Sequence, residues 1–470
     1  MRPYPPIRVT EAGMKALLLV GNAVSKGGLP ESRPLETILR YCLSSPFSCT
    51  LRCKDPVISS TALEDRPVIQ RKQHTSILLV LGFMSAIGPL SVDMYLPGFP
   101  AIAADLKTDI SHVGLSLTSF FIGIAIGQLA YGPVMDRYGR KKPLIFGLLV
   151  YIAASLGCAF APSIHFLIAL RLLLALGGCV GMAGSRVIVR DLFSGSEIAR
   201  ALSMLVLVFG VAPIIAPTIG GLVVAVLGWR FIFLILAVIA TLVLIAVYRF
   251  LPESKGADTS ISLHPKHAVL EYFKVFKDRA FLTSALASAA ATAGFLAYIS
   301  GSPFVYMKLL GFTETQFGWI YGANALGLIA ASQINRMWLR SRSSTEVLYL
   351  ATVAQFCVVT VLLTGLLIGF SGKIAILVLI LCYLFCLGFV SPNAMALALQ
   401  PFTRNVGSAS ALIGSFQMVA GASASGLLSY LHNGTAIPMV AVMAGCAGIS
   451  LAVLHGAAVS AKPESGSAFS

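Results

Sequence analysis

The sequence predicts an all-α polytopic membrane protein with twelve transmembrane helices in two pseudo-symmetric six-helix bundles. Its 470 residues are 57% hydrophobic and only 11% charged, and the mean hydropathy is +0.86. Water-soluble domains carry about 25% charged residues, so this composition excludes a water-soluble globular protein. The chain also has 34 Lys and Arg against 19 Asp and Glu. In a membrane protein such an excess is typical of cytoplasmic loops, so we expect the lipid bilayer, and no nucleic acid, as its partner.

Apolar stretches of about one bilayer thickness follow one another along the chain. A helix needs roughly 20 apolar residues to cross about 30 Å of hydrocarbon. The run from Asn405 to Ala461 lacks Lys, Arg, Asp and Glu and is too long for one crossing, and the turn signals at His432–Thr435 divide it. The predicted spans are 75–97, 113–134, 143–161, 164–186, 201–226, 229–249, 280–306, 315–336, 346–369, 374–398, 405–430 and 435–458.

Lys and Arg are concentrated in every second connection between these spans. Examples are Lys141 and Lys142 after the second span, Arg200 after the fourth and Arg340 after the eighth. Because positive residues resist translocation, the pattern predicts that both termini are cytoplasmic. The longest hydrophilic connection then separates the bundles, which gives an N-terminal bundle at 74–250, a cytoplasmic linker at 251–279, a C-terminal bundle at 280–460 and a cytoplasmic tail at 461–470.

Residues 1–73 do not fit the pattern of spans. Their only apolar run is shorter than the core of a signal peptide. Cys42, Cys49 and Cys53 have no nearby His to complete a zinc set, so we expect no metal. Two interpretations stay open, a disordered tail or translated sequence upstream of the true start.

The loop between the second and third spans reads Gly132-Pro-Val-Met-Asp136-Arg137-Tyr-Gly139-Arg140-Lys-Lys. An acid just after a helix C-terminus faces the negative end of the helix dipole and needs a cationic partner. Arg137 and Arg140 can supply it, and the glycines allow close backbone approach. The simpler alternative is a positive-inside topology signal. The spacing, however, resembles the GxxxDRxGRK/R loop motif of the major facilitator superfamily (MFS).

Two charged residues, Asp93 and Arg171, lie inside predicted spans. Both lie in the outer part of their predicted spans, on the same side of the membrane, so the two could lie close enough to interact. An intramembrane charge costs about 2.5–3.5 kcal/mol and is a functional candidate by default. The alternatives are a buried ion pair that only fixes helix packing, or an arginine that snorkels to the surface.

The fifth span contains Gly210-Val-Ala-Pro-Ile-Ile-Ala216-Pro217-Thr-Ile-Gly220-Gly221. Membrane helices tolerate such prolines and glycines, which make a kinked, smooth packing surface. Ordinary small-residue packing is one interpretation. The run also resembles the antiporter motif of MFS exporters, with Ser203, Ala212 and Ala216 where the family has glycine and with Pro217, Gly220 and Gly221 kept.

The end of the first span, Ser91-Val-Asp-Met-Tyr-Leu-Pro-Gly-Phe-Pro100, narrows the resemblance. It is similar to the DMYLPxxP segment of the bicyclomycin and chloramphenicol resistance (Bcr/CflA) drug:proton antiporters. The stretches 189–193, 228–233 and 391–396 resemble the same branch. The matches run from about residue 75 to about residue 430 and imply the MFS fold.

This resemblance implies proton-coupled efflux of amphipathic antibiotics of the bicyclomycin or chloramphenicol type by alternating access in the bacterial inner membrane. The proton gradient would be the only energy source and no cofactor would be needed. Asp93 would be the carboxylate that responds to both the proton and the drug, with Arg171 as its charged neighbour. We also expect the protein to be a monomer.

The resemblance also assigns a gate. Asp136, Arg137 and Arg140, with Arg190 and Asp191 below the fourth span, would latch the cytoplasmic side. Aromatic and amide side chains on other spans are candidates for a drug cavity, although each could equally be polar glue between helices. These candidates are Tyr95, Phe295, Tyr298, Asn324, Asn393 and Gln417.

Other functions fit the sequence less well. The first alternative is a proton-coupled exporter of small metabolites such as amino acids or short peptides. Uptake by symport is disfavoured by the antiporter-like fifth span. An embedded enzyme would need clustered His, Asp or Glu within the spans, where Asp93 and Arg171 are the only such pair of charges. No Walker loop occurs to support direct use of ATP.

Overall fold

The computed structural model describes residues 71–194, 196–258, 278–369, 372–402 and 406–460. These residues form helices, and no strand occurs among them. The helices of the first half are α3 (Arg71–Asp93), η2 (Leu96–Gly98), α4 (Phe99–Asp105), α5 (Ile110–Tyr138), α6 (Lys141–Ala159), α7 (Ile164–Leu192), α8 (Ser196–Leu227) and α9 (Arg230–Phe250). Those of the second half are α11 (Arg279–Pro303), η3 (Phe304–Leu309), α12 (Glu314–Trp338), α13 (Ser344–Leu367), α14 (Lys373–Leu399), α15 (Val406–Tyr430) and α16 (Ile437–Ser460).

Each predicted span overlaps a described helix. Within the described part of the chain, eleven helices are long and apolar enough to cross a membrane. The helix outside that set is α12, which has 25 residues but carries polar side chains such as Asn324 and Asn335. Both asparagines are buried, so the low hydropathy of α12 reflects polar contacts inside the bundle.

The first predicted span is longer than the helix that forms. It was expected to continue to residue 97, whereas α3 ends at Asp93 and the chain continues through the short η2 and α4. Pro97 and Pro100 are the physical reason, because proline lacks the N–H that a continuing helix would use. Asp93 therefore lies at a helix end.

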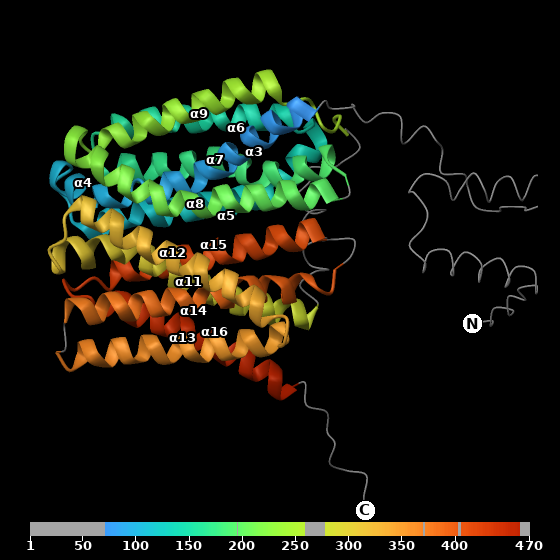
Figure 1. Cartoon of the computed structure of the whole chain (residues 1–470). Helices are drawn as coiled ribbons and strands as arrows, with labels where there is room; N and C mark the ends of the chain where they lie inside the picture. Colours follow the sequence, from blue (N-terminus) through green and yellow to red (C-terminus); the bar gives the residue numbers. More distant parts are fainter. Residues whose placement is uncertain (1–70, 195, 259–277, 370–371, 403–405, 461–470) are drawn as a thin grey trace, which may run out of the picture. The chain divides into compact units, whose positions relative to one another are not determined.

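The helices gather into two groups of six long helices, the first from α3 to α9 and the second from α11 to α16 (Figure 1). Among the described residues, the groups contact each other mainly through two helix pairs, α5 with α15 and α8 with α12, which form two seams. Hydroxyl side chains support the first pair, where Thr118 Oγ1 donates to Ser425 Oγ at 2.9 Å.

Several sequence predictions fall outside the described residues. They concern the N-terminal extension up to residue 70 with its three cysteines, most of the linker (259–277) and the tail from 461 to 470. The described start of the linker, 251–258, extends from α9 and contributes to the site below.

Candidate functional site

The two ends of the helical bundle are formed by different segments of the chain. α4 and η3 contact each other at one end, which we call the α4 end. The loop 136–142 and the segment 253–255 contact each other at the opposite end, which we call the loop end. α5 connects the two, beginning at Ile110 near α4 and ending at Tyr138 in the loop.

Asp93 bridges the two halves near the α4 end. It is the last residue of α3 and is 4% exposed. Its Oδ1 accepts a hydrogen bond of 3.0 Å from the hydroxyl of Tyr321, which lies on α12 in the other half. Tyr321 was not identified from the sequence, because nothing in a single chain indicates which residue of the second bundle faces the end of α3.

Arg171 is fully buried on α7 but does not pair with Asp93. Its Nη1 donates to the carbonyl oxygen of Ser91 at 2.9 Å. Its guanidinium carbon lies 4.3 Å from the ring centroid of Tyr95 and 4.5 Å from that of Phe120, which is cation–π geometry. Among the described residues, its Nε and Nη2 have no hydrogen-bond partner.

The expected direct interaction between Asp93 and Arg171 is therefore wrong for this conformation, since no ion pair joins them in the described part of the chain. The physical reason is orientation. Arg171 turns toward a backbone carbonyl and aromatic faces within its own half, whereas Asp93 turns across the seam to Tyr321.

Tyr95 belongs to the packing around Arg171 rather than to a drug cavity. Its side chain is fully buried, and its hydroxyl lies 2.7 Å from Ser116 Oγ on α5. The ring contacts Phe99 and Phe233 as well as the guanidinium of Arg171.

Three other cavity candidates come together with Tyr321. The rings of Tyr298 and Tyr321 stack with centroids 6.0 Å apart and an interplanar angle of 18°. Phe295 stacks on Tyr298 at 6.3 Å. Asn324 Nδ2 donates to the hydroxyl of Tyr298 at 2.9 Å and to that of Tyr306 at 3.4 Å. This tyrosine cluster, which consists of Tyr298, Tyr306, Tyr321 and Asn324, is buried in the second half beside Asp93.

The last two cavity candidates connect helices within the second half. Asn393 Nδ2 donates to Asn335 Oδ1 at 2.7 Å, which joins α14 to α12. Gln417 Nε2 donates to Ser288 Oγ at 2.8 Å, which joins α15 to α11. For both residues the structure shows polar contacts between membrane helices, the alternative to a role in a cavity.

The segment from Ala216 to Gly221 packs α8 against both halves at the α4 end. Ala216 and Pro217 are buried. A Cβ added at Gly220 would collide with the carbonyl oxygen of Met94, just after Asp93. A Cβ added at Gly221 would lie 2.5 Å from the carbonyl oxygen of Glu314 on α12. These two glycines therefore allow a backbone approach that another residue would prevent.

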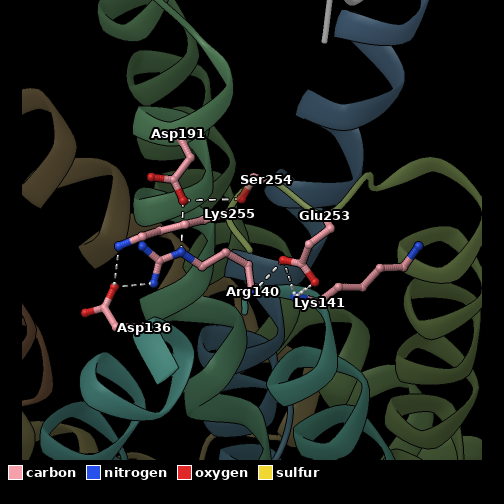
Figure 2. A network of polar contacts seen from close by, with 7 residues as sticks. All are labelled: Asp136, Arg140, Lys141, Asp191, Glu253, Ser254 and Lys255. Atoms are coloured by element: carbon pink, nitrogen blue, oxygen red, sulfur yellow. Dashed lines mark hydrogen bonds and ion pairs between the residues drawn. The ribbon is translucent and has the colours of Figure 1, made fainter. Parts of the chain in front are cut away.

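At the loop end, Arg140 is the centre of a charged network (Figure 2). It is only 5% exposed. Its Nη1 lies 2.9 Å from Asp136 Oδ1 and its Nε lies 2.9 Å from Asp191 Oδ2. Lys255 Nζ adds a second cation 3.4 Å from Asp136 Oδ1, and Ser254 Oγ donates to Asp191 Oδ2 at 3.2 Å.

Glu253 completes this network from the start of the linker. Its Oε1 accepts the backbone N–H groups of Arg140 at 2.6 Å and of Lys141 at 3.2 Å. An acid at this position stabilises the N-terminus of α6, whose first N–H groups have no partner within the helix. Gly139 precedes the helix with φ of +82°, a conformation that favours glycine.

Sequence reasoning missed Glu253, Ser254 and Lys255 because it treated them as the beginning of a linker. The available signal was topological, since the connections after the second, fourth and sixth spans are predicted on one side. The other gate candidates lie beside the network. Arg137 lies 5.8 Å from the ring centroid of Tyr138, and Arg190 is exposed.

Gly132, the first glycine of the loop motif, is exposed. No described atom lies within 4 Å of the position that its Cβ would take. The expected close approach at this glycine is therefore absent from this conformation. Among the described residues, no three His, Cys, Asp or Glu side chains are grouped as a metal site requires.

Comparisons with known proteins agree with this architecture. Residues 81–425 match the family described as Major Facilitator Superfamily. The chain is 36% identical over 375 residues to "Uncharacterized MFS-type transporter YdgK" of Bacillus subtilis (strain 168), which covers 79% of this chain and 92% of that protein.

Two further relatives are named as resistance proteins. "Bicyclomycin resistance protein homolog" of Haemophilus influenzae is 32% identical over 81% of this chain and 96% of its own length. "Multidrug resistance protein D" of Escherichia coli (strain K12) is 27% identical over 77% of this chain and 90% of its own length.

Solved structures support the fold alone. A POT family transporter in complex with a thioalcohol-conjugated peptide superposes with a TM-score of 0.66 at 14% identity, covering 81% of this chain and 95% of that one. The matched family covers most of the chain, and its members are transporters, not enzymes. The chain therefore belongs to the major facilitator superfamily of multi-pass membrane transporters, and its relatives are consistent with the Bcr/CflA branch of that family.

Proposed function

We propose that this protein is a proton-coupled efflux transporter that exports amphipathic antibiotics of the bicyclomycin or chloramphenicol type by alternating access. The observation that carries the proposal is the hydrogen bond between Asp93 of the first half and Tyr321 of the second. In transporters of this architecture, one half rocks against the other around a central site. A titratable group that bridges the halves is therefore suited to couple proton binding to that motion.

The chemistry of this contact gives the coupling a direction. A hydrogen bond to an ionised carboxylate is roughly twice as strong as one between neutral groups. Ionised Asp93 therefore holds Tyr321 and favours closure of the α4 end. A proton neutralises the carboxylate and weakens the bridge, so protonation favours opening there. A drug and a proton that select different conformations are coupled through that difference in free energy.

We assign the loop end to the cytoplasm because it carries the Lys- and Arg-rich connections. On this assignment both termini are cytoplasmic, the protein resides in a bacterial inner membrane, and the α4 end faces outward. The network around Arg140, with Asp136 and Asp191, would act as the cytoplasmic latch. We further propose that the proton gradient is the only energy source and that the monomer is the working unit.

The choice of substrate class has two supports. Relatives are named for resistance to bicyclomycin and to multiple drugs. The tyrosine cluster and Phe295 offer flat aromatic faces beside a titratable acid, a combination that suits amphipathic molecules. Export of small metabolites such as amino acids or short peptides is the other outcome that the test below distinguishes.

The test is to express the protein in a bacterium that lacks its own drug pumps and to measure inhibitory concentrations for a panel of antibiotics and for toxic amino-acid and dipeptide analogues. We expect raised values for bicyclomycin or chloramphenicol that an uncoupler abolishes. Asp93→Asn should lose the effect at equal membrane abundance. Asp109→Asn, which alters an exposed acid at the start of α5, is the matched control and should keep it. Resistance that persists with the uncoupler, or in Asp93→Asn, would contradict the proposal.

A further inference from the structure

The tyrosine cluster contains a buried amide that has no direct contact with Asp93 but is linked to it by a continuous chain of contacts. Asn324 lies on α12 three residues after Tyr321, on the same face of that helix. It is 5% exposed. An Asn side chain has two N–H donors on one nitrogen, and here that nitrogen serves two tyrosine hydroxyls, of Tyr298 and Tyr306.

Those two tyrosines lie outside α12, in two consecutive elements. Tyr298 lies near the end of α11, and Tyr306 lies in η3, a π-helical segment from Phe304 to Leu309. Short π-helical segments are rare and often occur at functional sites. Asn324 therefore ties α12 to the irregular end of α11, and its loss would leave two buried hydroxyls without this donor.

Tyr298 transmits this constraint to the bridge between the halves. Its ring stacks on Tyr321 with centroids 6.0 Å apart, and Phe317 packs against Tyr321 with its centroid 5.8 Å away. Both rings contact the ring of Tyr321 while its hydroxyl donates to Asp93. The contacts run in sequence from Asn324 to Tyr298, then to Tyr321, then to Asp93.

We propose that Asn324 is a positioning residue that holds Tyr321 against Asp93 through the stacked ring of Tyr298, and thereby sets the pH at which the α4 end of the bundle opens. This inference rests on the proposed function, because it takes Asp93 to be the proton-responsive group. The inference goes beyond the proposed function because it assigns part of the control over the protonation of Asp93 to residues of the second half.

The groups that face Asp93 fit this assignment. Among the described residues, the titratable side chains that interact with it are Tyr321 from α12 and Tyr298 from α11. The part of α8 that packs beside it, Pro217–Gly221, contains no titratable residue. Arg171 of α7 donates to the Ser91 carbonyl. The interacting titratable groups thus belong to the cluster that Asn324 organises.

The experiment is hydrogen–deuterium exchange of the purified full-length protein across a pH series, with rates corrected for intrinsic exchange. The reporter segments are 94–105 and 310–322, which include η2, α4 and the start of α12. The wild type should show faster exchange below a midpoint pH. Since a hydrogen bond donated to a carboxylate favours its ionised form, Asn324→Ala should move this midpoint upward by about half a pH unit.

The matched control is Asn335→Ala, which removes another buried asparagine on the same helix, one that pairs with Asn393. It should leave the midpoint unchanged. Tyr298→Phe, which keeps the stacked ring and removes the hydroxyl, tests the same chain of contacts should Asn324→Ala fold poorly. It should shift the midpoint in the same direction, and the double variant should shift it no further.

A wild-type midpoint in both Asn324→Ala and Tyr298→Phe, or an equal shift in Asn335→Ala, would overturn the inference. Because the readout needs no cargo, its failure is distinguishable from failure of the proposed function. A protein whose exchange midpoint responds to Asn324 but which exports no antibiotic would retain the positioning role and lose the substrate assignment.

Discussion

Asp93 and Arg171 differ in how their buried charges are accommodated. Asp93 has a hydrogen-bond donor from the opposite half, whereas Arg171 has one carbonyl acceptor and aromatic faces from its own half. Buried polar groups normally find partners, and a buried charge without one is costly. The aromatic faces around Arg171 partly offset that cost.

The hydroxyl of Tyr321 is the group that we expect to matter most beside Asp93. Tyr321→Phe keeps the ring that packs against Tyr298 and Phe317, so the protein should fold and reach the membrane. Removing the donor should lower the initial rate of gradient-driven transport about tenfold, since hydrogen bonds to charged groups contribute about 1.5–3 kcal/mol.

The control for Tyr321→Phe is Tyr383→Phe. Tyr383 is also buried in the second half, but its hydroxyl has no hydrogen-bond partner among the described residues. Its removal should leave the rate unchanged. Equal rates in the wild type and Tyr321→Phe, measured in vesicles at matched protein amounts, would contradict the role assigned to the bridge.

For single residues, the sequence identified the buried charged groups but not the residues that they contact. Asp93 and Arg171 stand out because charges within apolar spans are rare. Their spacing along two helices suggested that they meet, yet helix depth alone does not determine side-chain direction. Tyr321 and Glu253 gave no local signal, because each acts through a contact with a residue more than 100 positions away.

At the scale of helices, the α8–α12 seam depends on backbone contact. The Ala216–Gly221 segment was recognised by its small residues, and the structure adds what they contact. Gly220 packs on the end of α3, and Gly221 packs on the start of α12. The same stretch thus contacts the helix that ends at Asp93 and the helix that carries Tyr321.

Gly221→Ala should separate α8 from α12 at the α4 end, because the new Cβ would lie 2.5 Å from a backbone oxygen that cannot rotate away. We expect amide exchange in residues 314–321 to rise about tenfold, which corresponds to roughly 1.4 kcal/mol. Gly210→Ala on the same seam is the control, since its Cβ would lie 3.7 Å from the flexible end of Ile329. Unchanged exchange in Gly221→Ala would show that the seam tolerates separation.

In the loop network, the sequence predicted the contact between Asp136 and Arg140 but not the contacts of Glu253, Ser254 and Lys255. The helix-dipole argument indicated Arg137 and Arg140 as possible partners of Asp136, and the structure pairs Asp136 with Arg140. The segment from Glu253 to Lys255 joins the same network from the end of α9 (Figure 2). Predicting this contact required knowledge of how α9 packs against α6.

At the scale of the whole molecule, the architecture was predictable because the membrane limits the possible solutions. Spans of about 20 apolar residues must form helices when no water is present to pair with the backbone. The longest hydrophilic connection then divided the spans into two halves. α12 departs from this pattern because its buried asparagines and Tyr321 make polar contacts within the second half and across the seam.

The two halves are in contact along both seams in this conformation, and the Asp93–Tyr321 bridge lies at the α4 end of one of them. On the proposed function, the coupling between proton and cargo would be a property of the pair of halves, since neither half contains both Asp93 and Tyr321. The Asp93–Tyr321 bridge joins the two halves, whereas the ion pairs described at the loop end join elements of the first half.

We propose that Asp93 exchanges a proton against the cargo. The most direct test measures proton release when the antibiotic to which the protein confers most resistance is added to purified protein in weakly buffered detergent solution. We expect the wild type to release roughly one proton per bound molecule and Asp93→Asn to bind the antibiotic with no release. Equal proton release from Asp93→Asn and the wild type would contradict the account.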